Sequence, residues 1–201
     1  SRLTNLIGSD QEAVGIEAAY KLGRLGQQGL EPLIEAATGD DPVACRNAIY
    51  GFSQMGQEAA PSLIEMLSHD QAEARVRAAD TLGDLGLQAK SSLPTLFEKL
   101  SDQDDKVRHH AAEAMGTIAP DEDTAVEPLT KALTDEVDLV RRNAALSLAR
   151  IGQHATQAVP ALTLALKDSN HFVRAFSGQA LESNGTPEAM AALLEHLRAV
   201  R

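Results

Sequence analysis

The sequence contains few aromatic residues and no tryptophan. Aromatic residues make up 3% of the 201 residues, whereas apolar residues as a whole make up 43%. A core of this composition must be built from alanine, leucine, isoleucine and valine, which suits closely packed helices better than stacked β-sheets. The shortage of aromatic residues therefore favours an all-α fold.

Basic residues and cysteines are also scarce. The 18 lysines and arginines are outnumbered by 29 aspartates and glutamates, and the formal net charge is −11. Because an average field of this sign repels phosphates, no nucleic-acid partner is expected, and a DNA-repair enzyme built from helical repeats is disfavoured. Cys45 is the only cysteine, so no internal disulfide can form, and a reducing, cytoplasmic location is predicted.

Several sequence signals for other classes of protein are missing. No apolar run approaches the roughly 18 residues that a membrane-spanning helix needs, so no transmembrane segment is expected. No signal peptide, nucleophile elbow or glycine-rich phosphate loop is visible either. The sequence begins with Ser1, and Leu3, Leu6 and Ile7 look like the end of a helix, which leaves open whether further repeats precede it.

Six short helix-like runs each end at a glycine or an alanine, and their spacing is nearly constant. The closing residues are Gly26, Gly56, Gly86, Ala119, Gly152 and Gly185, with successive gaps of 30, 30, 33, 33 and 33 residues. A fixed period in this range indicates stacked repeats that present a long surface instead of one central pocket. We predict a single repeat domain over residues 1–201, with units ending near these positions and a terminal helix over 187–200.

Each unit is predicted to contain two helices, named here helix A and helix B in chain order. Proline recurs near the expected start of helix A, where its missing N–H has no partner to lose. Aspartate recurs before helix B, where it can cap the helix, and glycine follows helix B as a left-handed C-cap. The prolines are Pro32, Pro61, Pro94, Pro128 and Pro160, and the aspartates are Asp40, Asp70, Asp102, Asp135 and Asp168.

Two segments, residues 107–116 and 140–149, carry the pattern Val-Arg-x-x-Ala-Ala most clearly. They resemble the HEAT repeat, and with the short period they look most like its phycobilisome-lyase HEAT-like subfamily. The resemblance implies a right-handed α-solenoid of about six HEAT-like helix pairs plus a terminal helix. It also implies that helix B lines the concave side and that repeated Asp and Arg residues bond between neighbouring repeats. The third to sixth units have an arginine at this position, namely Arg75, Arg108, Arg141 and Arg174. The first two units have Gly15 and Cys45 there instead.

The outward face of the helices B is the predicted partner-binding surface. Helix B laid out at about 100° per residue places two tyrosines in equivalent positions of adjacent units, with basic, acidic and again basic residues along the chain. Tyr and Arg are enriched among interface hot spots, and a charge pattern selects a complementary partner. The residues are Ile16, Tyr20, Arg24, Arg46, Tyr50, Asp80, Asp84, His109, Glu113, Arg142 and Arg150. The alternatives are tyrosines packed inward along the seam and ordinary solvated charges.

Catalytic and metal sites are not expected. His109, His110 and Glu113 could supply ligands from one helix, and Asp80 lies on one neighbouring ladder, but Arg142 on the other side would repel a cation. Cys45 is expected to be a small buried residue, although Arg46 beside it could activate a thiol. No cofactor and no catalytic residue are predicted. The last helix B, with Phe172, Phe176 and Gly178, is interpreted as a transition to a polar terminal cap.

The leading hypothesis is a non-enzymatic scaffold or adaptor that binds another protein through its concave helix-B surface. The alternative comes only from the subfamily resemblance. It is a bilin lyase or bilin-detaching factor, whose partner would be a phycobiliprotein.

Overall fold

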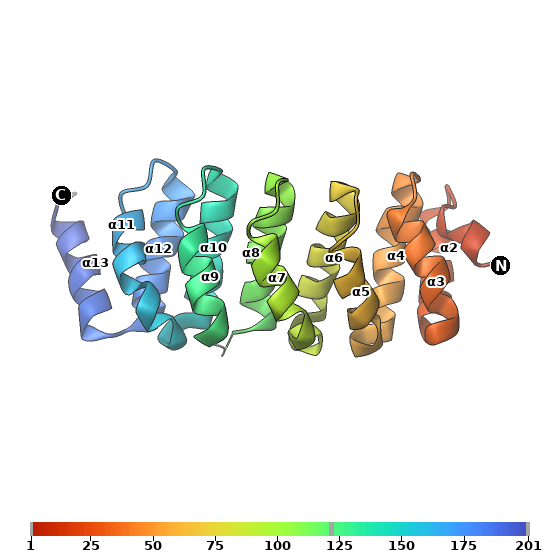
Figure 1. Cartoon of the computed structure of the whole chain (residues 1–201), viewed down its shortest axis with the longest axis horizontal. Coiled ribbons are helices and arrows are strands. Elements are labelled where there is room, and N and C mark those ends of the chain that lie inside the picture. The colour runs from red at the N-terminus through yellow and green to blue at the C-terminus, as the bar shows by residue number, and fades with distance from the viewer. Residues whose placement is uncertain (1, 121–122, 200–201) are drawn as a thin grey trace. The chain divides into compact units, whose positions relative to one another are not determined.

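A computed structural model describes residues 2–120 and 123–199, and every regular element within those ranges is a helix (Figure 1). The all-α prediction is therefore confirmed. The chain divides into two compact units, Ser1–Ser92 and Leu93–Arg201, each with its own buried apolar residues. The prediction of one domain over residues 1–201 stays a prediction. Within the described ranges, no helix is both long and apolar enough to cross a membrane.

The first unit alternates longer helices B with helices A. The helices B are α2 (Glu12–Arg24), α4 (Pro42–Met55) and α6 (Ala72–Leu85). The remaining elements are α1 (Thr4–Ile7), α3 (Gln27–Thr38), the 3₁₀ turn η1 (Gly56–Ala59), α5 (Ala60–Met66) and η2 (Gly86–Ser92). Leu22, Leu33, Phe52, Leu63 and Leu82 are fully buried and fill the space between the two kinds of helix.

The second unit follows the same order. Its helices B are α8 (Asp105–Ile118), α10 (Asp138–Ile151) and α12 (His171–Asn184). Its other elements are α7 (Leu93–Lys99), η3 (Asp123–Ala125), α9 (Val126–Ala132), η4 (Gly152–Ala158), α11 (Val159–Ala165) and α13 (Pro187–Ala199). The core again consists of aliphatic residues, among them Leu96, Met115, Leu129 and Leu148.

The closing glycines follow the helices B as predicted, but the predicted left-handed helical conformation is wrong for four of the five. All five have φ between 55° and 68°, a region that side chains rarely adopt. Only Gly185, with ψ of 4°, is in the left-handed helical region, whereas Gly26, Gly56 and Gly86 have ψ of −131° to −133°. Ala119 closes α8 with φ of −130°, which an alanine adopts without strain.

The prediction that proline lies in the first turn of helix A holds for four repeats and is wrong for Pro32. Pro61, Pro94 and Pro160 are the second residues of α5, α7 and α11, and Pro128 is the third of α9. Pro32 instead lies inside α3. In the other four repeats a 3₁₀ turn precedes the α-helix, whereas α3 is already helical from Gln27. The equivalent proline therefore falls in the interior of α3.

The aspartates predicted to cap the helices B do not cap them. The observed N-caps include Asp41, Asp104 and Asn170, whose side chains accept backbone N–H groups of the first turn. Two residues earlier, the Oδ1 atoms of Asp102, Asp135 and Asp168 accept the N–H groups of residues 104, 137 and 170 at 2.8–3.0 Å. In the first unit Ser9 and His69 do the same for residues 11 and 71. Asp40 and Asp70 are one residue too late for this role.

The aspartates of the second unit bind arginines of the preceding repeat. Arg108 donates from Nε and Nη2 to Asp135 at 2.8 and 3.1 Å, and Arg141 does so to Asp168 at 2.7 and 3.0 Å. The Nη1 atoms donate to the Asp102 and Asp135 carbonyls at 3.0 and 2.8 Å. The bonding between repeats that the family resemblance implies is thus present at these two pairs, where all four side chains are largely buried.

Candidate partner-binding surfaces

Tyr20 and Tyr50 lie side by side on the helices B of the first unit. Their ring centroids are 5.8 Å apart with an interplanar angle of 47°, and each side chain is 37% exposed. Tilted aromatic pairs at this distance attract one another beyond the area that they bury. The predicted adjacency is therefore present, and the role of the pair in binding a partner stays a prediction.

The close approach of α2 and α4 brings these rings together. A side chain at Gly23 would collide with the backbone oxygen of Gly51, and one at Gly51 would meet the Leu33 side chain and the Ala19 oxygen, the latter at 2.9 Å. The absence of a side chain at Gly23 and at Gly51 thus allows the backbones of α2 and α4 to approach closely, which places equivalent positions of these helices next to each other.

A shallow groove of about 520 Å³ runs along the exposed face of α2 beside Tyr20. Three of the predicted residues, Ile16, Tyr20 and Arg24, line it together with Ala13, Glu17 and Lys21. Lys21 Nζ lies 2.8 Å from Glu17 Oε1, and this contact lowers the pKa of Glu17. The groove is therefore lined by apolar side chains together with exposed charged ones.

The other predicted residues of the first unit are accessible. Arg46 is exposed on α4, and Asp80 and Asp84 are exposed one helical turn apart on α6. Basic and acidic side chains therefore occupy neighbouring helices B of this unit. The longer basic–acidic–basic pattern also involves residues of the second unit, and it stays a prediction.

In the second unit, Asn143 connects two of the predicted residues. Its Nδ2 donates to Glu113 Oε2 at 3.2 Å and to the His109 carbonyl at 3.1 Å. Asn143 is buried, whereas His109 and Glu113 are half-buried on α8. Burial, the adjacent His110 and then Arg142 lower the pKa of His109, while Glu113 opposes this shift, so its imidazole is largely neutral at pH 7.

Arg142 belongs to an aromatic cluster that sequence reasoning missed. Its guanidinium carbon lies 5.9 Å from the centroid of the Phe172 ring, a cation–π distance. Phe172 is 46% exposed and stacks on Phe176 at 6.4 Å and on His171 at 3.9 Å. From the sequence this helix is expected only to form a transition to the cap. The available signal was two phenylalanines four residues apart on a helix B, the spacing of one face. Arg150 is exposed near the end of α10.

The terminal helix α13 is less polar outside than predicted. Among its described residues only Ala189 is buried, and Met190, Leu194 and Leu197 are 36–50% exposed. These three share one helix face at i, i+4 and i+7. The polar residues Glu188, Glu195 and Arg198 are exposed too, so the cap presents a mixed surface.

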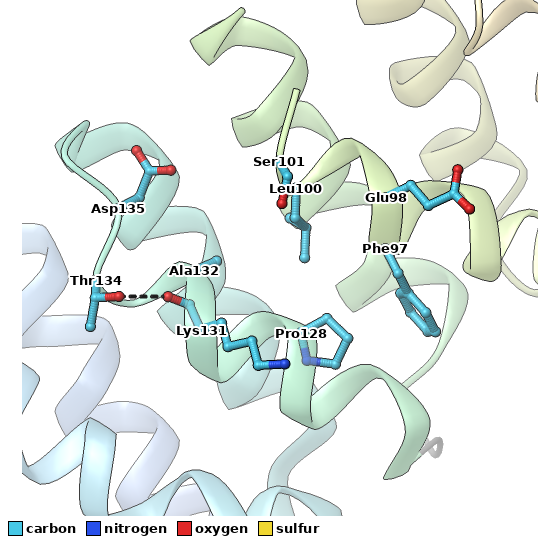
Figure 2. Close-up of a pocket in the computed structure, with 9 residues that line it drawn as sticks. All are labelled: Phe97, Glu98, Leu100, Ser101, Pro128, Lys131, Ala132, Thr134 and Asp135. Atoms are coloured by element: carbon cyan, nitrogen blue, oxygen red, sulfur yellow. Dashed lines mark hydrogen bonds between the residues drawn. The ribbon is translucent and has the colours of Figure 1, made fainter. Parts of the chain in front are cut away.

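A second groove, of about 560 Å³, lies between the helices A of the second unit. None of the predicted partner-binding residues lines it. Figure 2 shows the Phe97 ring and Leu100 from one repeat facing Pro128 and Lys131 from the next. Asp135 lines this groove, but its carboxylate is held by Arg108, and Thr134 Oγ1 donates to the Lys131 carbonyl at 2.9 Å (Figure 2). The lining is partly apolar and its charges largely have partners.

Residues that could support chemistry are few. Cys45 is 3% exposed, its Sγ donates to the Gly39 carbonyl at 3.2 Å, and burial raises its pKa, so the thiolate is disfavoured. Cys45 is therefore the small buried residue that was predicted. His109, His110 and Glu113 form a group whose ligand atoms lie within 4.8 Å of one another.

Residues 60–149 and 126–200 match the family described as HEAT repeats. The chain belongs to the HEAT-repeat family. The paired helices, the closing glycines and the Arg–Asp bonds between neighbouring repeats of the second unit are the structural features of these HEAT repeats. No curated protein matches the chain.

Solved structures of designed repeat proteins resemble these HEAT repeats. A crystal structure of an engineered protein is 25% identical, covers 92% of this chain and 97% of its own, and has a TM-score of 0.63. A designed armadillo repeat protein in complex with the peptide (KR)4 is 19% identical, covers 92% and 98%, and also has a TM-score of 0.63. The likeness establishes an all-α solenoid-type repeat fold, as predicted from the repeat period.

Proposed function

We propose that this HEAT-repeat protein is a scaffold or adaptor that binds a protein partner through the outer face of its helices B. The observation that carries this proposal is the pair of Tyr20 and Tyr50. The only two tyrosines of the chain lie 5.8 Å apart on adjacent helices, and both are 37% exposed. Keeping two large aromatic rings at the surface makes sense where another molecule covers them.

The proposed surface has an anchor and a charged margin in each unit. In the first unit Tyr20 lines a groove with Ile16 and Arg24, and Arg46, Asp80 and Asp84 are exposed on the next helices B. In the second unit His109, Glu113, Arg142 and Arg150 are joined by Phe172, which the sequence did not suggest. Affinity would come from the aromatic and Arg anchors, and selectivity from the pattern of charge.

Partner capture with variant proteins tests the proposal. The double variant Tyr20→Ala/Tyr50→Ala should lose the partner that the unaltered chain retains from a lysate of the source organism, because two hot-spot residues each contribute about 2 kcal/mol. Leu87→Ala is the matched control, since Leu87 is a large exposed side chain in η2, 66% exposed. Equal recovery by the unaltered chain and the tyrosine variant would contradict the proposal. Circular dichroism must show both variants folded.

A basic peptide is a useful first probe. The similar designed armadillo repeat protein was crystallised with (KR)4, and this chain carries a net charge of −11. Attraction of a cationic peptide to an acidic surface should weaken as salt shortens the Debye length. Labelled (KR)4 is therefore titrated into the unaltered chain and into the tyrosine variant at two salt concentrations. General electrostatic attraction should weaken with salt equally in both proteins. Docking on Tyr20 and Tyr50 should be lost only in the variant.

The second candidate function rests on the subfamily resemblance. The Val-Arg-x-x-Ala-Ala segments begin in the first turn of α8 and α10, where their arginines bond to the next repeat. This arrangement supports a shared repeat architecture with the phycobilisome-lyase HEAT-like group. A bilin lyase or detaching factor should shift the visible absorption band of added phycocyanobilin. An unshifted spectrum with bilin in excess would remove this candidate and leave the scaffold proposal untouched.

A further inference from the structure

Three potential metal ligands lie together on α8. His109, His110 and Glu113 each offer one ligand atom, and these atoms all lie within 4.8 Å of one another. The two imidazole rings are 4.1 Å apart between centroids. His109 and Glu113 are four residues apart and therefore share one face of the helix. All three side chains are half-buried, so the cluster is shielded but reachable.

The geometry is close to that of a bound ion. Zinc lies about 2.0–2.2 Å from nitrogen and oxygen ligands, which puts ligand atoms about 3.4 Å apart in a tetrahedral site. These atoms lie within 4.8 Å of one another, so at most about 1.4 Å has to close, which rotation about the side-chain torsions can supply. The helix backbone that carries all three residues does not have to move.

A neighbouring residue already orients the carboxylate. Asn143 Nδ2, on α10, donates to Glu113 Oε2 at 3.2 Å and to the His109 carbonyl at 3.1 Å. Because Asn143 is buried, these bonds fix Glu113 on the His109 side of the helix. Outer hydrogen bonds of this kind commonly hold the ligands of metal sites in place.

Arg142 is the residue that argues against a cation, and the structure shows where it lies. Its Nε donates to Asn143 Oδ1 at 3.3 Å and its guanidinium lies over Phe172, on α12. These two contacts hold the Arg142 side chain against Asn143 and the Phe172 ring of α12. Arg142 should therefore weaken binding of a cation without blocking it.

We propose that His109, His110 and Glu113 bind a divalent transition-metal ion of the zinc, nickel or copper class. Two imidazole nitrogens and one carboxylate oxygen would be the protein ligands, and water would complete the coordination. Imidazole favours these ions over magnesium and calcium, which prefer oxygen ligands. This site is independent of the proposed partner, because metal binding by the isolated chain needs no second protein.

The test is a titration of the untagged full-length chain with zinc chloride in a calorimeter. We expect one ion per chain. His109→Asn and Glu113→Gln should each weaken the affinity at least tenfold, as loss of a ligand does. Glu113→Gln keeps an oxygen that can accept from Asn143, so it separates loss of the ligand from loss of the fold. His154→Asn removes an exposed histidine outside the cluster and should leave the affinity unchanged.

A second measurement identifies the ligands. Copper(II) bound to the chain should give an electron paramagnetic resonance spectrum with nitrogen couplings, and these should diminish in His109→Asn. Arg142→Gln should tighten zinc binding, since a positive charge near the site is removed. Absence of stoichiometric zinc binding would overturn the proposal, as would equal affinities for the unaltered chain and both ligand variants.

Discussion

At the residue scale, the arginines at the start of α8 and α10 stabilise the fold. Each gives two hydrogen bonds to an aspartate of the next repeat and others to backbone carbonyls. Planar guanidinium groups suit this fork-like pairing, which a lysine cannot reproduce. The same residues are the most recognisable part of the sequence pattern, so the pattern reports on stability more than on function.

Replacement of Arg108 tests this role. Arg108→Ala leaves Asp135 without its partner at a site where both side chains are less than 15% exposed. We expect a loss of about 3 kcal/mol in the free energy of unfolding, because one partner of a buried pair is removed. Lys131→Ala is the control, since its bond to Glu127 joins two side chains that are each more than 70% exposed. Urea unfolding should show almost no change for it. Equal losses in the two variants would contradict this account.

The pairing of Asp168 predicts how stability depends on pH. The Arg141 guanidinium and the Asn170 N–H lower the pKa of Asp168 below its ordinary value of 3.8. The unfolded chain therefore binds this proton at a higher pH than the folded chain does. The stabilisation is complete above the unfolded pKa and is lost as the pH falls through the folded pKa.

Asp168→Asn should thus be less stable than the unaltered chain at pH 7, and the two should converge as the pH falls from 3.8 through the lower pKa of the folded state, where the native aspartate becomes protonated. Urea midpoints measured at several pH values check this convergence. A difference that stays constant down to the lowest pH at which the chain folds would show that the charge is not the cause.

At the scale of single elements, the sequence predicted helix pairs, their order and the residues that end them. Glycine with positive φ is almost the only residue that fits those positions, so the pattern leaves little freedom. The cap assignments were less certain because an aspartate can accept N–H groups at the N-cap or two residues before it. Asp102 and Asp104 occur together, and only the structure shows which of them caps α8.

Two glycines inside helices B provide a matched test of packing. Gly51→Ala on α4 should destabilise the chain, because its new methyl group would collide with Leu33 and meet the Ala19 oxygen. At Gly178 on α12 the nearest atoms, on Leu166 and Leu193, are 3.7 and 3.8 Å from an added methyl group. Gly178→Ala should therefore stabilise by about 0.5–1 kcal/mol through helix propensity. Thermal melts of the two variants should shift in opposite directions. A lower melting temperature for Gly178→Ala would contradict the contacts described.

The candidate site was predictable in part for the same reason. Helical periodicity places Tyr20 and Tyr50 on an outer face, and a period of 30 residues makes them neighbours. The contact between Arg142 and Phe172 was not predictable from the sequence. The two residues occupy different positions within their repeats, so no repeated pattern marks them as neighbours. Asn143 was missed because its role depends on the rotamer of a buried amide.

At the scale of the whole molecule, the chain presents grooves and exposed side chains along its helices. Its described grooves are shallow, its thiol is buried, and its acidic balance opposes anionic partners. A HEAT-repeat fold with exposed aromatic residues on the helices B fits a protein that holds another protein. The proposed metal ligands lie on the same set of helices, so an ion could adjust that surface without taking part in a reaction.

The most direct measurement is photo-crosslinking in cells of the source organism. A benzoyl-phenylalanine replaces Tyr50 in one variant and Leu87 in another, both of which are exposed in the first unit. The account predicts that position 50 crosslinks to one discrete protein and that position 87 does not crosslink to that protein. The same crosslinks from both positions, or a partner captured only from position 87, would contradict the claim that the helix-B face is the binding surface.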